Sequence, residues 1–106
     1  MNLPMTEARI EVAADGSIAI IGELNHQNVP TLLKKSADIV LKTSDQHDEL
    51  VIDLGAVVRS DSAGVALLIE WMRQAKKNNK TILFNNTPKQ MHEIAMVSGV
   101  DKMLAM

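Results

Sequence analysis

The chain has 106 residues, of which 46% are hydrophobic and 23% charged, and its formal net charge at pH 7 is −2. A chain of this length forms one compact domain, and this balance of apolar and charged residues is typical of a folded protein. Aromatic residues make up only 2% of the chain and the charge is weakly negative, which argues against nucleic-acid binding and against direct docking on a membrane.

Several kinds of site are excluded by residues that the chain lacks. It has no cysteine, so a disulfide framework, a thiolate zinc site and a cysteine nucleophile are ruled out. No run approaches the roughly 18 consecutive apolar residues of a membrane-spanning helix, and the N-terminal stretch lacks the apolar core of a secretory signal. We therefore expect a cytoplasmic, soluble protein without direct membrane insertion.

The N-terminal part of the chain predicts a β-hairpin. Residues 9–12 alternate polar and apolar side chains, which is the period of a half-buried strand. Asp15 and Gly16 then lie between two apolar runs, and this dipeptide favours a tight turn because glycine tolerates a positive φ. We therefore expect residues 17–22 to form a second strand, antiparallel to the first.

A helix and a buried strand are predicted next. Asn28 is of a residue type that caps helices, and Pro30 is compatible with a first helical turn. Apolar residues then recur at helical spacing, namely Val29, Leu32, Leu33, Ala37, Val40 and Leu41. The polar residues 42–49 predict a loop. The continuous apolar run 50–54 predicts a strand covered on both faces, as in a parallel sheet.

The C-terminal half predicts two further helices and a strand. An amphipathic helix spans residues 62–78 and ends at the polar run K-K-N-N-K, and residues 81–85 form the next buried strand. Pro88 opens a last helix, which Gly99 ends as a C-cap. The residues of that helix expected to point inward are Met91, Ile94, Ala95 and Val97. Residues 102–104 could add a short strand.

This order of elements predicts an α/β fold with one domain over residues 8–105 and an N-terminal extension over residues 1–7. The sheet is expected to be mixed, with four to five strands, and packed by three to four α-helices. The sequence contains no internal repeat, low-complexity tract or interdomain linker.

The helix over residues 62–78 carries apolar residues on more than one side. On a helical wheel its core side contains Gly64, Val65, Leu68, Ile69, Met72 and Ala75. Leu67 falls nearly opposite the core centre, close to Ala63, with Trp71 on the flank. Such a group is typical of the centre of a protein interface. The alternative is a wide apolar stripe in which Leu67 belongs to the core and Trp71 folds over the sheet edge.

The stretch R-S-D-S-A-G at 59–64 places small polar residues directly before this helix. Ser60 or Asp61 can accept hydrogen bonds from the free N–H groups of the first turn, as an N-cap does. Ser62 would then project from the helix N-terminus, where the backbone amides and the helix dipole favour an anion. A phosphate on Ser62 would be stabilised there while adding about two negative charges to any surface packed against it, so phosphorylation could switch an interface off.

The sequence shows no arrangement of catalytic or metal-binding residues. A nucleophilic Ser62 would need a nearby base, but His26, His47 and His92 have no spacing that implies an approach to it. The histidines also lack H-x-x-x-H spacing, and the glycines form neither a P-loop nor a G-x-G-x-x-G motif. We therefore expect a protein that is not an enzyme and that needs neither a metal nor a cofactor.

The residues around this cluster resemble those of STAS domains, the family that includes the bacterial anti-sigma-factor antagonists. The likeness rests on the strand V-I-D-L at 51–54 and on D-S-A-G-V at 61–65, which follows it after a loop and begins an amphipathic helix. The order of elements over about residues 8–105 is also that of the STAS fold. The resemblance therefore implies a domain that works by binding other proteins.

Within this family, D-S-A-G-V-A-L-L-I-E-W at 61–71 is more similar to the MlaB branch, which serves a transporter, than to the sigma-regulatory branch. That resemblance implies a cytoplasmic subunit that binds and stabilises or activates a MlaF-like ABC ATPase, in a complex with a MlaE-like permease and a MlaD-like lipid-binding protein. Such a complex moves phospholipid between the inner and outer membranes of Gram-negative bacteria and maintains outer-membrane lipid asymmetry. The subunit would be peripheral to the inner membrane through its protein partner.

The resemblance also implies where the partner binds. The expected partner-binding residues are Arg59, Ser60, Asp61, Ser62, Ala63, Ala66, Leu67 and Glu70. Ser62 matches the hydroxyl residue that meets the ATPase in the MlaB branch, and the first three residues would form a polar rim.

Two other hypotheses belong to different classes of partner. In the antagonists, the residue that matches Ser62 is the serine phosphorylated by the anti-sigma kinase, so the main alternative is an anti-sigma-factor antagonist regulated by phosphorylation at Ser62. Ala63 stands where the antagonists typically have a second serine, which favours the transporter branch. A STAS domain that serves some other complex is the third hypothesis.

Overall fold

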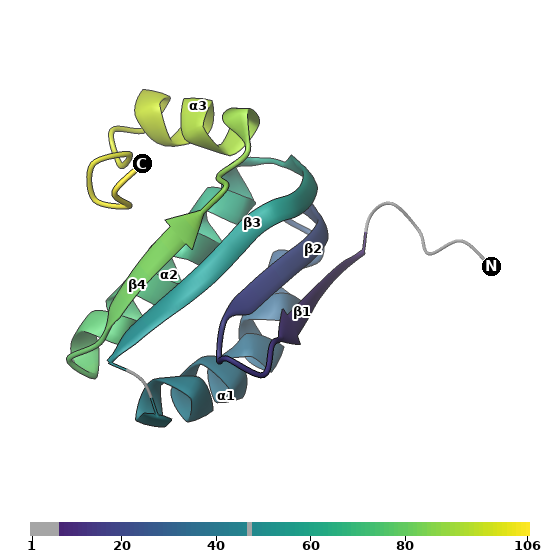
Figure 1. Cartoon of the computed structure of the whole chain (residues 1–106). Coiled ribbons are helices and arrows are strands. Elements are labelled where there is room, and N and C mark those ends of the chain that lie inside the picture. The colour runs from purple at the N-terminus through teal and green to yellow at the C-terminus, as the bar shows by residue number, and fades with distance from the viewer. Residues whose placement is uncertain (1–6, 47) are drawn as a thin grey trace.

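The computed structural model describes residues 7–46 and 48–106, and the side chains of residues 7–38 and 48–106. Figure 1 shows the elements in chain order: β1 (Ala8–Val12), β2 (Ile18–Leu24), α1 (Val29–Gln46), β3 (Glu49–Ser60), α2 (Ser62–Lys77), β4 (Thr81–Asn85) and α3 (Lys89–Val97). The described residues therefore contain one mixed sheet of four strands and three helices, which confirms the predicted fold class.

The sheet has the strand order β1-β2-β3-β4. β1 and β2 form the predicted antiparallel hairpin, whose turn places Gly16 at φ 88° and lets Asp15 Oδ1 accept a hydrogen bond from the Ser17 N–H at 2.9 Å. β2, β3 and β4 run parallel to one another. Each parallel connection is therefore a crossover that contains a helix.

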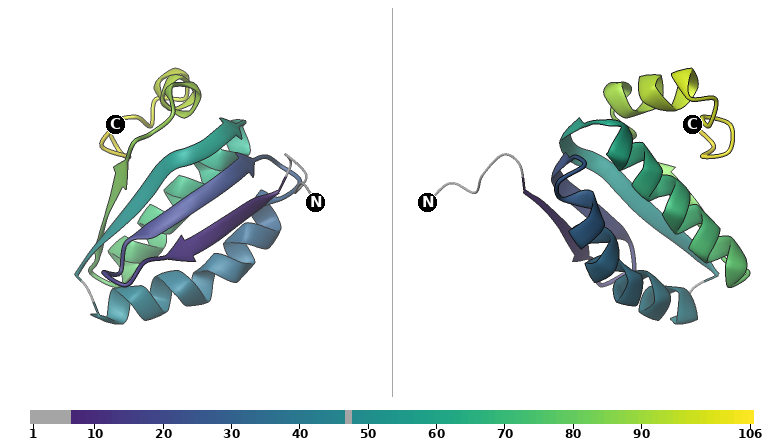
Figure 2. Two further views of the ribbon diagram at one scale, coloured as in Figure 1. Left: turned by 45° about the vertical axis from the view of Figure 1, so that its right-hand side comes forward. Right: turned by 180° about the vertical axis from the view of Figure 1, so that it is seen from behind.

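The helices α1 and α2 lie on the same face of the sheet (Figure 2). Both crossovers step one strand in the same direction, and because such connections are right-handed, both helices must pass on the same side. β3 shows the result, since Leu50, Ile52 and Leu54 are fully buried whereas Val51 is only half-buried. The prediction that this strand is covered on both faces is therefore wrong, and it also fails for β4, where Ile82 is buried but Leu83 is 39% exposed.

The orientation of α2 about its axis also differs from the prediction. Leu67 and Trp71 are only 1% and 0% exposed, whereas Ile69 and Met72 are half-buried. The indole Nε1 of Trp71 donates a hydrogen bond to Ser36 Oγ on α1 at 2.9 Å, so this flank of α2 packs against α1. The helical wheel considered burial against the sheet alone, and α1 buries a second flank of α2. The prediction of a surface-exposed Leu67 is wrong, and Trp71 belongs to the core.

The boundaries of α1 correct two further predictions. Residues 42–46 are helical and not part of a loop, because α1 continues to Gln46. His47 lies outside the described residues. The N-terminal turn is capped by Asn25 and not by Asn28, because Asn25 Oδ1 accepts hydrogen bonds from the N–H groups of Gln27 and Asn28, each at 2.9 Å.

The C-terminal region confirms the predicted end of α3. The Gly99 N–H donates to the Met96 carbonyl oxygen at 3.1 Å and the Val100 N–H to that of Ala95 at 2.9 Å, with Gly99 at φ +75°. This is the pattern of a Schellman motif, which glycine favours.

Two predictions for the same region fail. Met91 and Ala95 are buried as expected, but Val97 is 90% exposed. Residues 102–104 form turns and not a strand, although Leu104 still packs into the core. None of the described helices combines the length and the apolarity that crossing a membrane requires.

Candidate partner-binding site

The cluster before α2 lies where two parallel strands end. β2 and β3 run parallel, so the segment after Leu24 and the segment after Ser60 meet at the same edge of the sheet. The Asp61 N–H donates a hydrogen bond to the Leu24 carbonyl oxygen at 3.0 Å, which joins the two segments directly. Residues far apart in the sequence therefore surround the start of α2.

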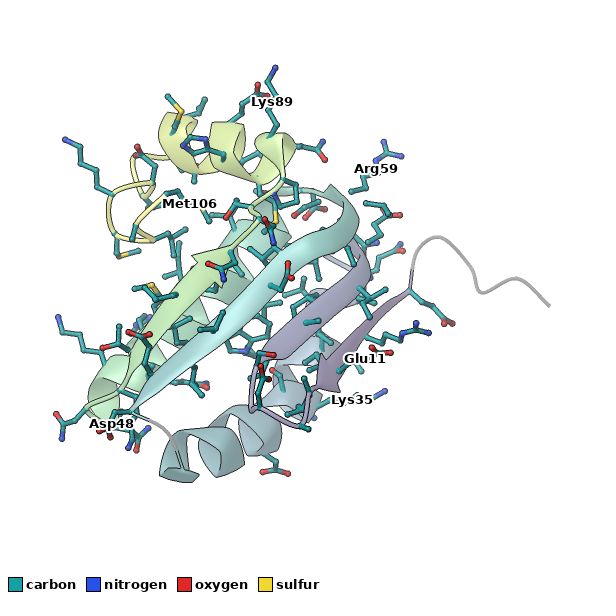
Figure 3. All side chains as sticks on the ribbon, viewed as in Figure 1. Glu11, Lys35, Asp48, Arg59, Lys89 and Met106 are labelled. Atoms are coloured by element: carbon teal, nitrogen blue, oxygen red, sulfur yellow. The ribbon has the colours of Figure 1, made fainter. Side chains whose placement is uncertain are left out.

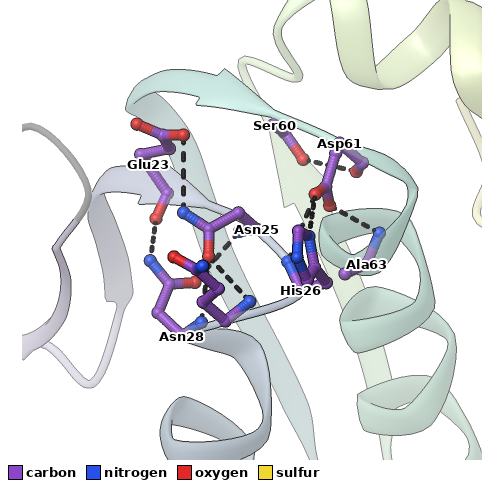
Figure 4. A network of polar contacts seen from close by, with 8 residues as sticks. Glu23, Asn25, His26, Asn28, Ser60, Asp61 and Ala63 are labelled. Atoms are coloured by element: carbon purple, nitrogen blue, oxygen red, sulfur yellow. Dashed lines mark hydrogen bonds and ion pairs between the residues drawn. The ribbon is translucent and has the colours of Figure 1, made fainter.

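Asp61 is the N-cap of α2 and also holds the neighbouring loop. Its Oδ1 accepts a hydrogen bond from the Ala63 N–H at 2.8 Å. Its Oδ2 accepts one from the His26 N–H at 3.2 Å and lies 3.4 Å from His26 Nδ1 (Figure 4). Partial burial alone would raise the pKa of the Asp61 carboxyl group, but the hydrogen bonds from Ala63 and His26 outweigh it, so this pKa lies below its ordinary value. The carboxylate form is thus favoured.

The loop that carries His26 is fixed by a reciprocal pair of asparagines. While Asn25 Oδ1 caps the turn, Asn28 Oδ1 accepts a hydrogen bond from the Asn25 N–H at 3.0 Å, and Asn28 Nδ2 donates to the Glu23 carbonyl oxygen at 2.7 Å (Figure 4). This exchange has the logic of a capping box, with Asn28 in the position of the returning side chain. His26 is thereby held on an ordered turn while its side chain remains 81% exposed.

Ser60 has a structural role beneath the helix. It is 2% exposed, its hydroxyl group donates to the Asp61 carbonyl oxygen at 3.0 Å, and its N–H donates to Gln90 Oε1 on α3 at 3.0 Å. A Cβ atom at Gly64 would lie 2.0 Å from Ser60 Oγ and 3.0 Å from Leu24 Cβ. Only glycine permits this close approach of the first turn to the strand ends. The prediction that Ser60 belongs to the exposed rim is therefore wrong.

The remaining predicted residues stay accessible. Ser62 is exposed at the first position of α2, and Ala66 and Glu70 follow it at intervals of four residues along the same side of the helix. Arg59 is exposed and projects away from the sheet at the end of β3 (Figure 3). We call this set the α2 N-terminal surface; it consists of Arg59, Asp61, Ser62, Ala63, Ala66 and Glu70. Leu67 does not belong to it because it is buried.

Several residues near Ser62 were not predicted. A groove of about 620 Å³ borders Ser62 and is lined by the β2–α1 loop and by α3, through Asn25, His26, Gln90 and Ile94 among others. The β2–α1 loop could have been identified from the predicted order of parallel strands, because that order brings the ends of β2 and β3 together. The approach of α3, by contrast, has no local signal.

The surroundings of the Ser62 hydroxyl group are simple in the described part of the chain. No described residue forms a hydrogen bond with the Ser62 hydroxyl group, and His26 instead faces Asp61. The described part of the chain contains no group of three or more side chains able to hold a metal ion. A free hydroxyl group beside two alanines is a small, flat feature against which another protein can pack.

Comparisons with known proteins show the family and the fold of the chain. Residues 10–105 match the family model described as "Mlab, STAS domain". The structure is similar to that of the anti-sigma factor antagonist SpoIIAA in its unphosphorylated form, with a TM-score of 0.67 and 16% identity over 94% of this chain and 98% of the other.

Two further structures show the same likeness. The Bacillus cell fate determinant SpoIIAA in its phosphorylated form gives a TM-score of 0.65 at 19% identity, over 91% of this chain and 86% of the other. An anti-sigma factor antagonist from Mycobacterium paratuberculosis gives 0.66 at 21% identity, over 97% and 86% of the two chains. At these identities the likeness shows the fold alone.

Proposed function

Because the chain belongs to the STAS domain family in the branch described as "Mlab, STAS domain", we propose that it is the STAS subunit of a phospholipid transport complex and that it binds a MlaF-like ABC ATPase. Binding would stabilise or activate the ATPase within a complex that contains a MlaE-like permease and a MlaD-like lipid-binding protein. The domain would comprise residues 8–105, preceded by an extension at residues 1–7, and would be held at the inner membrane through its partner.

The exposure of Ser62 carries this proposal. The Ser62 side chain lies at the N-terminus of α2 beside the small residues Ala63 and Ala66. The turn beneath it is held by Asp61 and Gly64. Such a preformed surface can bind a protein with little cost in ordering. The Ser62 hydroxyl group has no hydrogen-bond partner among the described residues, which supports a contact role over a nucleophilic one, because a nucleophile needs a base within hydrogen-bond reach.

A pull-down with a matched pair of variants tests the proposal. The tagged wild-type protein, Ser62→Arg and Ser98→Arg would be recovered from detergent-solubilised cells, and co-purifying chains identified by mass spectrometry. Ser98 is also exposed, but it lies at the C-cap of α3. We expect the wild type and Ser98→Arg to recover an ABC ATPase and its permease, and Ser62→Arg to recover neither, because a long charged side chain would be buried there without a partner.

The fold of each variant is checked by thermal unfolding. Retention of the ATPase by a folded Ser62→Arg variant would refute the α2 N-terminal surface as the binding site. Recovery of no transporter subunit by the wild type would refute the proposed partner.

A second candidate is favoured by the same exposed hydroxyl group. Ser62 is accessible at a helix N-terminus, and the fold is shared with SpoIIAA, whose structure includes a phosphorylated form. If this protein is an anti-sigma-factor antagonist, the pull-down recovers a soluble kinase in place of the transporter, and Ser62→Asp abolishes that capture while Ser62→Ala retains it.

A further inference from the structure

A second accessible surface lies along the C-terminal half of α2. A groove of about 390 Å³ runs between this half of the helix and the start of β4. We call it the α2–β4 groove; its floor is formed by Ile69, Met72, Ile82 and Met103, and its cations are Arg73, Lys76 and Lys80. It lies toward the opposite end of α2 from Ser62, and nothing in the proposed function uses it.

We propose that the α2–β4 groove binds an extended acidic segment of a partner protein, which adds to the sheet as a strand beside β4. Three independent features of the groove support this occupant: its floor, the open edge of the sheet and the charge of its rim.

The floor of the groove is apolar and partly accessible. Ile69 and Met72 are half-buried, and Met103 is 48% exposed. Methionine side chains adapt their shape to a bound segment at low energetic cost. The floor can therefore receive the apolar side chains of an extended segment, which project on alternate positions.

The edge of the sheet beside the groove is open. β4 ends the strand order, and the Thr81 N–H donates to the Asp48 carbonyl oxygen on its inner side at 3.0 Å. Backbone groups of successive strand residues point to alternate sides, so those of Ile82 and Phe84 point outward. No backbone hydrogen bond from the described residues meets them there. An edge of this kind is a template for strand addition.

The charge of the rim selects the occupant. Arg73 lies 3.6 Å from Glu70 and Lys80 lies 3.1 Å from Asp48, whereas Lys76 is exposed and has no ion pair with a described residue. Lys77, the next residue, is exposed as well. The surplus of positive charge favours an acidic segment. It disfavours a second copy of this chain, which would bring the same cations together.

Peptide selection tests the proposal. A phage-displayed library of random nine-residue peptides would be panned on the Ser62→Arg variant, so that the α2 N-terminal surface is blocked. We expect enriched peptides in which apolar residues alternate with Asp or Glu. Lys76→Glu is expected to weaken an enriched peptide about tenfold in fluorescence anisotropy, because it replaces an attraction by a repulsion.

Two matched controls test separately the contribution of the Lys76 charge and that of the β4 edge. Lys35→Glu makes the same charge change at an exposed position of α1. In Figure 3 Lys35 lies on the opposite side of the molecule from Asp48, the ion-pair partner of Lys80 in the groove. This variant is expected to change the affinity less than about twofold. A peptide with alternate amides N-methylated is expected to lose binding, because it cannot donate to the β4 edge.

Four results would overturn the proposal: no enrichment, enrichment of basic peptides, equal loss of affinity in the two variants, and full binding of the N-methylated peptide. In parallel, sedimentation and anionic vesicles probe other occupants. A concentration-dependent dimer or vesicle binding, abolished by Lys76→Glu while panning enriches no acidic peptide, would assign the groove to a second copy or to a lipid surface.

Discussion

The two ends of α2 present surfaces of opposite character. At the N-terminus Ser62, Ala63 and Ala66 have small side chains. The first turn beneath them is fixed by the hydrogen bond from the Ala63 N–H to Asp61 and by the close packing at Gly64. At the C-terminus the side chains are long, apolar or cationic, and they border an open sheet edge. One helix can thus carry a rigid surface that recognises shape and an adaptable one that recognises charge.

Truncating the buried residue between these two ends has the largest expected effect. Leu67→Ala should lower the free energy of unfolding by about 2–5 kcal/mol, because it leaves a cavity in the core that α1 and α2 share. Urea unfolding measures this loss, with Glu70→Ala as the surface control. A Leu67→Ala variant that keeps its stability but loses its partner would contradict the assignment of Leu67 to the core.

A methyl group at Gly64 tests the close packing of the N-terminal end. Gly64→Ala should lower stability by about 1–3 kcal/mol, because the new Cβ meets Ser60 Oγ and Leu24 Cβ. Adding Ser60→Ala should restore part of the loss, since it removes the nearer of the two atoms. Chemical denaturation of the single and double variants provides the comparison, and strict additivity of the two changes would argue against the contact.

The carboxylate of Asp61 should make the free energy of unfolding depend on pH. Asp61→Ala should cost about 1 kcal/mol at neutral pH, as the loss of an N-cap does. The folded-state pKa of Asp61 lies below the ordinary 3.8, so its contribution is complete above that pH and is lost as the pH falls through the folded-state value.

Asp61→Asn separates the cap from its charge. It keeps a capping oxygen but does not titrate, so the stability difference between the wild type and this variant should shrink as the pH falls below about 4. Thermal unfolding between pH 2 and pH 7 checks this, and a constant difference would argue against a lowered pKa.

The smallest effect on stability is expected for a substitution at the C-terminal end of α2. Lys76→Glu should change the free energy of unfolding by less than about 0.5 kcal/mol, because the side chain is exposed and unpaired among the described residues. Urea unfolding of this variant establishes that its effect on peptide binding is local. A larger loss would mean that Lys76 supports the fold.

Local signals in the sequence predicted much of the fold. The turn at Gly16, the strand at 81–85, the span of α2 and the cap at Gly99 each follow from nearby residues, and the structure confirms them. The errors concern packing between distant elements. Which flank of α2 is buried depends on α1, and whether β3 is covered on one face or two depends on the direction of both crossovers.

The candidate site shows the same division. Asp61 was predicted as a possible cap because capping is local, and it is the cap. The meeting of His26 with Asp61 and of Gln90 with Ser60 joins segments about 30 residues apart or more, so spacing alone could not reveal it. Ser60 was misplaced for that reason, since its burial comes from Gly64, Leu24 and α3 together.

Trp71 gives this protein an optical reporter of its own. It is the only tryptophan in the chain and is completely buried. Its indole N–H donates a hydrogen bond to Ser36 Oγ, which joins α2 to α1. Its emission should therefore shift to longer wavelength when α1 and α2 separate, and should stay constant when either end of α2 takes up a ligand. Unfolding can then be followed without a label, and a constant emission in the presence of a ligand shows that the packing of α1 on α2 is unchanged.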